Sequence, residues 1–437
     1  MRKLLVALVV LTGALLAALL FQQIVVEGSL GPAAMVAAGG LSLVFLAMLA
    51  TLVLLNTRHR ALVANLWLAA FSIGISYFAL DLAAGWILIR PLSPPLVPDE
   101  YRHHKLVPDS YSEFNQRDFS YVQRVNALGF RGKETTVEKP QGTYRIVMLG
   151  DSFTMGKGVE DDQTFSVLVE RELNTRAEAC GGHVEVINAG VDSYAPVLEW
   201  LYLTRDLQKL HPDLVVMNLD VSDLVQEQAY RHESERDATG EVSAVPLRGD
   251  PDTIIDRIRV FTEHHLFLTR VALFYAIKTF DYRELTVRDV VTMANTETVA
   301  HTLVDDVDRT DQWRTIFDSI TKAKDFSKSH GMEFLLTVYP WAHQVSDTEW
   351  VPGRYTFMPD GARAADTSVR TIHEMSAANG VPLLDVTPVF RQHVGGTEHL
   401  YFDHDMHWTP AGHRVMAEGL TQYLEKTDSS RWCPGTP

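Results

Sequence analysis

A serine and a histidine stand in contexts where they can act together as a nucleophile and its base. Ser152 follows an apolar run of strand length, residues 145–149, and precedes a pattern typical of a helix. In an open α/β sheet this position lies at the carboxyl end of a strand, where reactive groups collect. Asp405 stands two residues before His407, so its carboxylate can orient the imidazole that takes a proton from Ser152. The pattern predicts acyl-transfer chemistry through a serine nucleophile.

The elements that must position these residues form a regular alternation of strand-like and helix-like runs. Such alternation predicts one parallel sheet with helices on both faces, a three-layer α/β/α domain of flavodoxin-like type. Strands are expected at residues 145–149, 184–188, 214–219, 333–339 and 383–386. Helices are expected at residues 164–175, 312–329, 364–378 and 410–424.

Before this domain, three nearly uncharged stretches are each long enough to cross a bilayer as a helix: residues 4–26, 30–55 and 62–89. Basic residues gather before the first stretch and between the second and third, at Arg2, Lys3, Arg58, His59 and Arg60. The positive-inside rule therefore predicts a cytoplasmic amino terminus and a multi-pass inner-membrane region over residues 1–90. The rest of the chain is then expected in the periplasm or outside the cell.

The remainder divides into a short linker and one large domain. Residues 91–98 contain four prolines and are expected to form a stiff, extended linker. Residues 99–437 are expected to form the extracytoplasmic domain, with an insertion at about residues 224–310 where the alternation weakens. This insertion is either a structural helical excursion or a lid or partner surface above the catalytic edge of the sheet.

Charge and cysteine content limit the partners and the compartment. The formal net charge of -16 and the lack of a basic cluster disfavour nucleic-acid binding. Cys180 precedes the second expected strand, and Cys433 follows the last expected helix. Both are therefore expected at the amino edge of the sheet, where an oxidising compartment would permit a disulfide. Two unpaired thiols are the alternative.

Three blocks of sequence occur in an order that resembles the SGNH/GDSL hydrolase superfamily, from about residue 99 to residue 426. They are Gly-Asp-Ser at 150–152, Asn-Ala-Gly at 188–190 and Asp-x-His at 405–407. Residues 126–132, Asn-Ala-Leu-Gly-Phe-Arg-Gly, are similar to a lead-in found in one membrane-anchored bacterial branch. The resemblance implies an SGNH-like fold and a catalytic triad of Ser152, His407 and Asp405.

The resemblance also implies an oxyanion hole, and here the sequence departs from the family. The backbone N–H groups of Ser152 and Gly190 would be two of its donors. The family has Gly-x-Asn-Asp after the third strand, where the asparagine is a further donor, but residues 220–223 are Asp-Val-Ser-Asp. Ser222 could substitute through its hydroxyl, or Asn218 could serve after a register shift. The aspartate that opens this block would oppose the forming charge unless it points elsewhere.

Two further groups of residues are candidates for binding. Trp341, His343 and Gln344 follow the fourth expected strand and are expected at the rim of the cleft, where they would contact substrate or pack against the insertion. Four side chains with nitrogen and oxygen ligand atoms stand near the last helix: His404, Asp405, His407 and His413. Their spacing matches no tight zinc pattern, so we expect neither a metal nor another cofactor there.

Two functions are compatible with these features. The first is a membrane-anchored serine esterase or O-acyltransferase that acts on O-acyl groups; the extracytoplasmic location favours acetyl esters of a glycan, although a small ester would also suit the chemistry. The second is a catalytically degenerate SGNH-fold module that binds or scaffolds a membrane assembly, with its helices docked to a partner protein. The intact Ser152, Asp405 and His407 favour the enzyme, and the altered residues 220–223 favour the scaffold.

Overall fold

The computed structural model of the chain describes residues 60–88, 96–247, 265–269, 298–304, 309–358 and 361–433, with isolated residues 12, 42, 45, 51 and 261. The first two predicted spans, residues 4–26 and 30–55, lie almost entirely outside the described residues. The chain divides into two compact units. One comprises Met1–Pro91 and Asp250–Asp289, and the other comprises Leu92–Gly249 and Val290–Pro437.

The first unit contains one long apolar helix, α3 (Arg60–Leu88), at the position of the third predicted span. Its segment Ala61–Trp86 is the one helix among the described residues that is long and apolar enough to cross a membrane. At a rise of 1.5 Å per residue, 26 residues extend about 39 Å. Large apolar side chains such as Phe71 and Trp86 are exposed on this helix. By length and composition alone, this helix could cross a bilayer.

Asp81 interrupts the apolar sequence of α3, and its carboxylate is fully buried. It accepts hydrogen bonds from the backbone N–H groups of Leu268 (2.5 Å) and Thr269 (3.1 Å) and from the Thr269 hydroxyl (2.5 Å). The backbone is close here, because a Cβ atom at Gly85 would lie 2.0 Å from the carbonyl oxygen of His265. Part of the predicted insertion therefore groups with α3 and not with the sheet domain.

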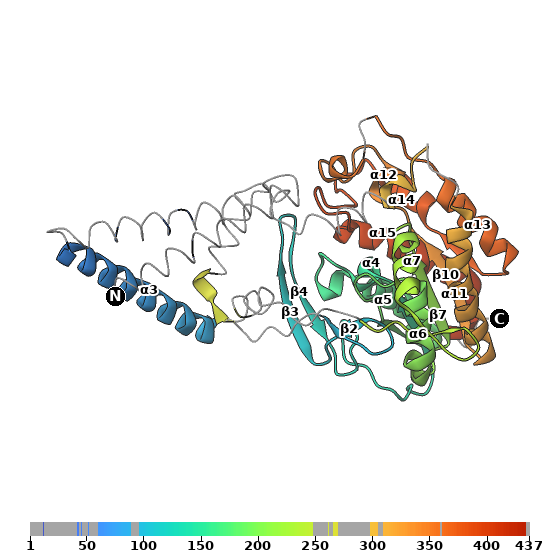
Figure 1. Cartoon of the computed structure of the whole chain (residues 1–437). Helices are drawn as coiled ribbons and strands as arrows, with labels where there is room; N and C mark the ends of the chain where they lie inside the picture. Colours follow the sequence, from blue (N-terminus) through green and yellow to red (C-terminus); the bar gives the residue numbers. More distant parts are fainter. Residues whose placement is uncertain are drawn as a thin grey trace. The chain divides into compact units, whose positions relative to one another are not determined.

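The second unit is built on a five-stranded parallel sheet in the order β11-β10-β7-β5-β6. Figure 1 labels β7 and β10 of this sheet. The strands are β5 (Thr143–Leu149), β6 (His183–Asn188), β7 (Leu214–Leu219), β10 (Glu333–Val338) and β11 (Leu383–Asp385). Each lies where the sequence predicts a strand. The predicted parallel sheet is therefore confirmed.

Helices cover both faces of this sheet and complete three layers. α5 (Phe165–Ala177), α14 (Thr387–His393) and α15 (Pro410–Trp432) contribute to one core. The other core includes side chains of α6 (Pro196–Arg205), α7 (Asp223–Glu233), α11 (Thr310–Ser329) and α13 (Thr367–Ala378). Along β5, Ile146 and Met148 face the first core, and Val147 and Leu149 face the second. This two-sided burial explains why the strands are continuous apolar runs without alternation.

The chain before β5 forms short strands rather than sheet-and-helix units. The last three residues of the predicted linker form β1 (Leu96–Pro98), which pairs with β2 (His104–Leu106). β3 (Ser110–Asn115) and β4 (Ser120–Val125) form an antiparallel hairpin. We refer to residues 99–142 as the N-terminal arm. The remaining short elements are α4 (Ser152–Met155), α12 (Ala342–Val345), β8 (Glu235–Arg236), β9 (Val242–Ala244), and 3-10 turns at Asp161–Gln163, Glu178–Cys180, Leu207–Leu210 and Gly353–Thr356.

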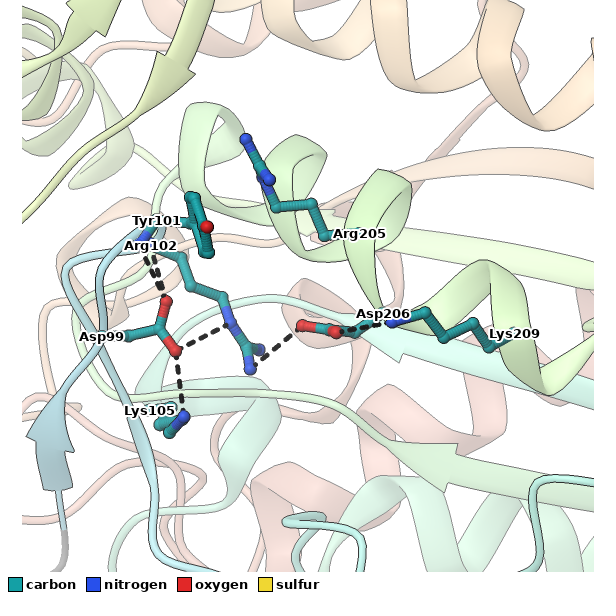
Figure 2. Close-up of a pocket in the computed structure, with 7 residues that line it drawn as sticks. All are labelled: Asp99, Tyr101, Arg102, Lys105, Arg205, Asp206 and Lys209. Carbon is teal, nitrogen blue, oxygen red and sulfur yellow. Dashed lines mark hydrogen bonds and ion pairs between the residues drawn. The ribbon is translucent and has the colours of Figure 1, made fainter.

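Ion pairs attach the start of the arm to the end of α6 around a pocket of about 490 Å³ (Figure 2). The guanidinium of Arg102 lies between two carboxylates, 3.8 Å from Asp99 and 3.2 Å from Asp206. It also lies 3.8 Å from the centroid of the Tyr202 ring. Because Arg102 is largely buried, these contacts compensate a charge that would otherwise be costly to remove from water.

Candidate active site

The nucleophile candidate, Ser152, is the first residue of α4, at the carboxyl end of β5. Asp151 caps this short helix, because its carboxylate accepts a hydrogen bond from the N–H of Phe153 at 2.9 Å. The hydroxyl of Tyr339, which follows β10, donates to the same oxygen at 2.9 Å. Gly150 makes the turn possible, since a Cβ atom there would lie 2.1 Å from the Thr154 hydroxyl oxygen. The strand-to-helix turn is thus held by Phe153 within α4 and by Tyr339 after β10.

Ser152, His407 and Asp405 are in mutual contact, although they come from opposite ends of the domain sequence. The hydroxyl oxygen of Ser152 lies 2.7 Å from Nε2 of His407. The other ring nitrogen, Nδ1, is hydrogen-bonded to the carboxylate of Asp405, which also accepts the backbone N–H of His407 at 2.9 Å. This is the arrangement in which a carboxylate fixes the tautomer of a general base and the base activates a hydroxyl.

Nearby charges keep the carboxylate of Asp405 ionised. Desolvation alone would raise its pKa, but the charge of His407 and its hydrogen bonds outweigh this and lower the pKa to about 2. Lys157 also lowers it. The carboxylate of Asp192 lies 3.6 Å from Nζ of Lys157. Its charge raises the pKa of Lys157, although desolvation lowers it. An ionised Asp405 can stabilise the imidazolium that forms when His407 accepts a proton.

Aromatic packing holds the His407 loop in place. The His407 ring lies 4.6 Å from the Phe153 ring, measured between centroids. Trp408 is fully buried, and its ring lies 5.0 Å from Phe153 and 4.8 Å from Tyr339. Immediately after it, the hydroxyl of Thr409 accepts N–H groups at the start of α15. The nucleophile turn, the end of β10 and the histidine loop therefore share one rigid aromatic cluster.

The second block places Gly190 against the nucleophile turn. A Cβ atom at Gly190 would lie 2.3 Å from the backbone nitrogen of Met155, so only glycine permits this approach. Asn188 bridges the two segments, with its amide donating to the carbonyl of Thr154 at 2.9 Å. Its side-chain oxygen accepts the N–H of Gly190 at 3.0 Å. The predicted oxyanion donor of Gly190 therefore already has an acceptor in this structure.

The third block directs its polar atoms toward one another. The hydroxyl and the backbone N–H of Ser222 donate to one carboxylate oxygen of Asp220, at 2.5 and 2.6 Å. Nε1 of Trp341 donates to the other oxygen at 2.8 Å. Asp220 thus points into a fully hydrogen-bonded site. Asn218 is committed to the sheet, where it donates to Leu149 and accepts from Thr337, so a register shift would break both of these bonds.

Comparison with known proteins decides the family. The model of the GDSL-like Lipase/Acylhydrolase family matches residues 148–415, more than half of the chain. The chain belongs to this family. The predicted SGNH/GDSL recognition and serine-hydrolase class are thereby confirmed, and the matched region contains both Ser152 and His407.

The solved structures that this chain matches share little sequence identity with it. A lipase/acylhydrolase from Enterococcus faecalis is 14% identical, covers 64% of this chain and 95% of its own, and has a TM-score of 0.33. A catalytic mutant of an acetylxylan esterase from Geobacillus stearothermophilus is 12% identical, covers 64% and 94%, and has a TM-score of 0.34. Because these TM-scores are low, the assignment rests on the family model. Among curated proteins, none matches the sequence.

A group of buried carboxylates that includes Asp151 of the nucleophile turn is a further feature of this GDSL-family chain. Asp151, Glu199, Asp220 and Asp223 are at most 4% exposed. Burial raises the pKa of Glu199 well above its usual range, and the charge of Asp151 adds to this effect. Burial and the charge of Asp220 likewise raise the pKa of Asp151. These raised pKa values favour the neutral acid forms behind the site.

The three rim candidates make buried protein contacts in the GDSL-family domain. Trp341 is 2% exposed and donates to Asp220, as described above. Nε2 of His343 lies 2.5 Å from the hydroxyl of Thr302, and burial lowers the pKa of His343 to about 3. The side-chain oxygen of Gln344 accepts the N–H of Trp341 at 2.8 Å. The contact with Thr302 is packing against the end of the predicted insertion, so the packing interpretation is the one these distances favour.

The histidines near the last helix have separate structural partners. His404 binds the carboxylate of Asp118 through Nδ1 at 2.8 Å. His413, in α15, accepts the N–H of Phe165 at 3.2 Å, and burial lowers its pKa to about 3. Within the described ranges, no group of three or more histidine, cysteine, aspartate or glutamate side chains could hold a metal ion.

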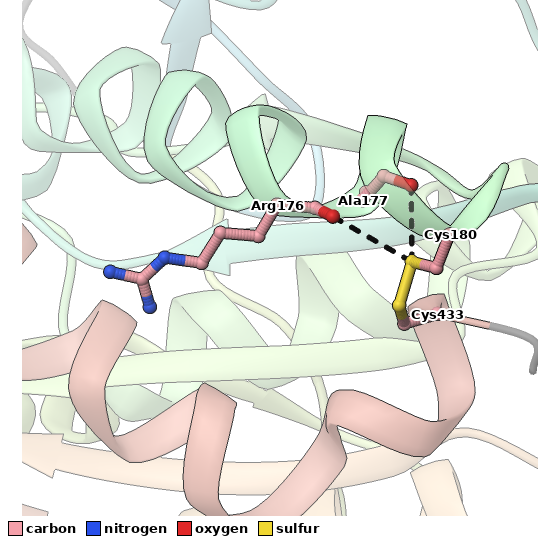
Figure 3. Close-up of a disulfide and its surroundings, with 4 residues drawn as sticks. All are labelled: Arg176, Ala177, Cys180 and Cys433. Carbon is pink, nitrogen blue, oxygen red and sulfur yellow. Dashed lines mark hydrogen bonds between the residues drawn. A yellow bond between two sulfur atoms is a disulfide. The ribbon is translucent and has the colours of Figure 1, made fainter. Parts of the chain in front are cut away.

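Cys180 and Cys433 form a disulfide that attaches the end of the chain to the helix layer (Figure 3). Cys180 ends the 3-10 turn after α5, and Cys433 follows α15. Their Cα atoms are 5.4 Å apart across 253 residues of sequence. As the sequence order suggests, this bond lies on the amino side of β6, away from the end of β5 that leads to Ser152.

Two residues of the N-terminal arm, Asp118 and Arg131, contact the catalytic loops and were not predicted to do so. Asp118 accepts the backbone N–H groups of His404 and Asp405, each at 2.8 Å. Arg131 donates to the carbonyls of Met155 at 2.9 Å and of Gly156 and Val159 at 2.5 Å. The sequence signal for Arg131 was its place in the lead-in motif, whereas Asp118 resembles any turn aspartate.

Proposed function

We propose that the protein is a membrane-anchored serine esterase or O-acyltransferase that acts outside the cytoplasm on O-acyl esters of glycans, with acetyl as the acyl group. The observation that carries the proposal is the 2.7 Å contact between the Ser152 hydroxyl and Nε2 of His407, with Asp405 on the opposite ring nitrogen. A hydroxyl, an imidazole and a carboxylate in this order perform acyl transfer on unrelated folds.

In the proposed reaction, Ser152 attacks the ester carbonyl while its proton passes to Nε2 of His407. Asp405 stabilises the resulting imidazolium. We assign the oxyanion to the backbone N–H of Ser152, with the Gly190 N–H and the Ser222 hydroxyl as weaker donors because Asn188 and Asp220 already accept their hydrogen bonds. The imidazolium then protonates the departing sugar oxygen, and an acyl-enzyme remains. Water or a second hydroxyl repeats the sequence in reverse and releases the acyl group.

The location and the glycan class rest on the membrane helix and the disulfide. α3 supplies one apolar segment that is long enough to cross a bilayer. The basic residues before it favour a cytoplasmic start of this helix, so the chain that follows it would lie outside the cytoplasm. A disulfide between Cys180 and Cys433 suits an oxidising compartment. Outside the cytoplasm, acylated polysaccharides are an abundant class of ester. Protease treatment of spheroplasts should therefore remove the hydrolase domain, and a protected domain would contradict the orientation.

Labelling with a fluorophosphonate tests the nucleophile directly. The full-length chain, purified in detergent, should be labelled covalently at Ser152, and Ser152→Ala should abolish the label without changing the thermal midpoint by more than about 2 °C. If the folded wild-type protein is not labelled, the enzyme proposal fails. Hydrolysis of an acetylated oligosaccharide faster than of a long-chain p-nitrophenyl ester would support the substrate class, and the reverse preference would contradict it.

One observation favours a second function, a non-catalytic binding or scaffold subunit of a membrane assembly. In the described structure, Asn188 accepts the N–H of Gly190 and Asp220 accepts the Ser222 hydroxyl. Each lost oxyanion donor costs about 3 kcal/mol of transition-state stabilisation. Folded protein that carries no labelled serine and co-purifies with a membrane partner through α3 would support this alternative.

A further inference from the structure

We propose that the N-terminal arm is a positioning element for both catalytic loops, and that Asp118 sets the position of Asp405 and hence of His407. The arm, residues 99–142, lies outside the region that the family model matches, residues 148–415. It would therefore be an addition to the GDSL domain that completes the site of this chain. The inference rests on the proposed catalytic function and concerns how that site is held.

The first observation is the set of bonds made by the turn between β3 and β4. Asp118 lies in this turn, and its side chain is only 9% exposed. One carboxylate oxygen accepts the N–H groups of both His404 and Asp405, and the other binds Nδ1 of His404, all at 2.8 Å. The ring of Phe119 packs beside it on Phe402, with 4.9 Å between centroids. The turn therefore fixes the backbone that carries the triad carboxylate.

The second observation is that the same hairpin is attached to the loop that follows the nucleophile. The N–H of Val122, in β4, donates to the Glu160 carboxylate at 3.2 Å. Arg131 is 4% exposed and binds three carbonyls between Met155 and Val159, as well as the Asp161 carboxylate at 2.9 Å. The arm thus spans from the nucleophile loop to the histidine loop. It fixes two segments that are more than 240 residues apart in sequence.

Geometry explains why such a support matters. Proton transfer from Ser152 requires His407 to stay near its 2.7 Å contact, and the position of His407 depends on Asp405. His404 and Asp405 belong to a segment without regular structure, residues 402–407. Loops of this kind hold a catalytic group well only when neighbouring groups fix their backbone. Asp118 supplies two hydrogen bonds to this backbone and a third to the ring of His404.

The test compares Asp118→Ala with a matched variant, Asp237→Ala, in the full-length chain. Asp237 also accepts three short-range hydrogen bonds in a hairpin turn, from Thr239 N–H, the Thr239 hydroxyl and Glu241 N–H. We expect Asp118→Ala to lower both kcat and the fluorophosphonate labelling rate by about 100-fold, with KM changed less than about threefold. Asp237→Ala should keep kcat within about twofold. Asp118→Asn retains one acceptor oxygen, so its kcat should be at least tenfold higher than that of Asp118→Ala.

Assays well below each thermal midpoint separate positioning from general instability. A folded Asp118→Ala protein with wild-type kcat would overturn the proposal, as would an equal loss in Asp237→Ala. Hydrogen exchange at the amides of His404 and Asp405 gives a readout independent of activity. Exchange there should be faster in Asp118→Ala only, and unchanged exchange would also overturn it. If wild-type protein is not labelled at Ser152, the proposed function fails, but the exchange result still decides whether Asp118 holds the loop.

Discussion

At the scale of single residues, the chemistry of this site depends on which groups keep a charge and which do not. Asp405 is ionised because His407 and Lys157 lower its pKa to about 2. In the same domain, burial raises the pKa values of Asp151 and Glu199. Burial favours the neutral form of all three carboxylates, but cations outweigh it at Asp405, whereas neighbouring carboxylates add to it at Asp151 and Glu199.

The charge of Asp405 leads to a prediction about catalysis. Asp405→Asn keeps the shape of the side chain but cannot stabilise an imidazolium, and its amide can hold the wrong tautomer of His407. We expect kcat for acetyl-ester hydrolysis to fall about 10³- to 10⁴-fold. Steady-state kinetics check this, with Asp403→Asn on the same loop as a control that should stay within about twofold. A loss of less than tenfold at Asp405 would exclude its role as orienter.

The raised pKa of Glu199 leads to a prediction about stability. In the unfolded chain this carboxyl ionises above about pH 4.5, whereas in the folded protein it holds its proton to higher pH. The folded state therefore binds more protons, and stability falls as the pH rises above this value. Glu199→Gln cannot ionise, so its thermal midpoint should exceed that of the wild type by a few degrees near neutral pH and converge with it near pH 4.

Thermal unfolding followed by circular dichroism over this pH range measures the effect. Glu374→Gln, on the exposed face of α13, is the matched control and should leave the pH profile unchanged. A Glu199→Gln profile parallel to that of the wild type at every pH would show that the buried carboxyl does not titrate between the folded and unfolded states.

At the scale of elements, the site is an intersection of loops at the ends of β5, β6, β7 and β10, closed by the loop before α15. Parallel strands bring their carboxyl ends to the same edge, so the blocks at 150–152, 188–190 and 220–223 converge by topology alone. The closeness of these loops then depends on small residues. Gly190 is the clearest example, because its neighbour is backbone and cannot move aside.

Gly190→Ala tests this packing. The added methyl would lie 2.3 Å from the backbone nitrogen of Met155, so α4 or the 188–190 loop must move. We expect at least a tenfold lower kcat and a loss of about 1–3 kcal/mol of unfolding free energy. Gly396→Ala is a suitable control, since its nearest atom would be 3.5 Å away. Equal effects of the two changes in kinetics and urea unfolding would refute the close-approach argument.

At the scale of the whole molecule, the chain combines a GDSL domain with a separate apolar unit. Residues 250–289 interrupt the domain and group with α3, where Asp81 accepts the N–H groups of Leu268 and Thr269. A carboxylate in an apolar helix is stable only when it has such partners. The domain itself is closed by a disulfide that joins the end of α15 to the end of α5.

The disulfide leads to a prediction about global stability. It closes a loop of 253 residues, so its removal gives the unfolded chain much more conformational freedom. The double variant Cys180→Ser/Cys433→Ser should lose about 2–5 kcal/mol of unfolding free energy. Its kcat near 20 °C should stay within about twofold, since the bond lies away from Ser152. Wild-type protein with a reductant should behave like the double variant in urea unfolding, and an unchanged midpoint in both would contradict the prediction.

The amino-acid sequence by itself determined the sheet and the identity of the chemical groups. Five apolar runs predicted five strands to within two residues at each end, because a strand buried on both faces is apolar over most of its length. The order of strands and helices then placed Ser152 and His407 at the same edge. These are local or topological properties, and neighbouring residues encode them.

Only the tertiary structure decided what supports the site and where its polar atoms point. Asp118 binds residues that lie 286 and 287 positions away, and nothing beside it in sequence distinguishes it from an ordinary turn residue. The same holds for the Ser222 hydroxyl, which could face substrate or Asp220, and for residues 250–289, whose helical pattern suits either unit. A hydrogen bond between distant segments leaves no periodic pattern in the sequence. It depends on where a side chain points, and this is fixed only when the helices and the sheet pack together.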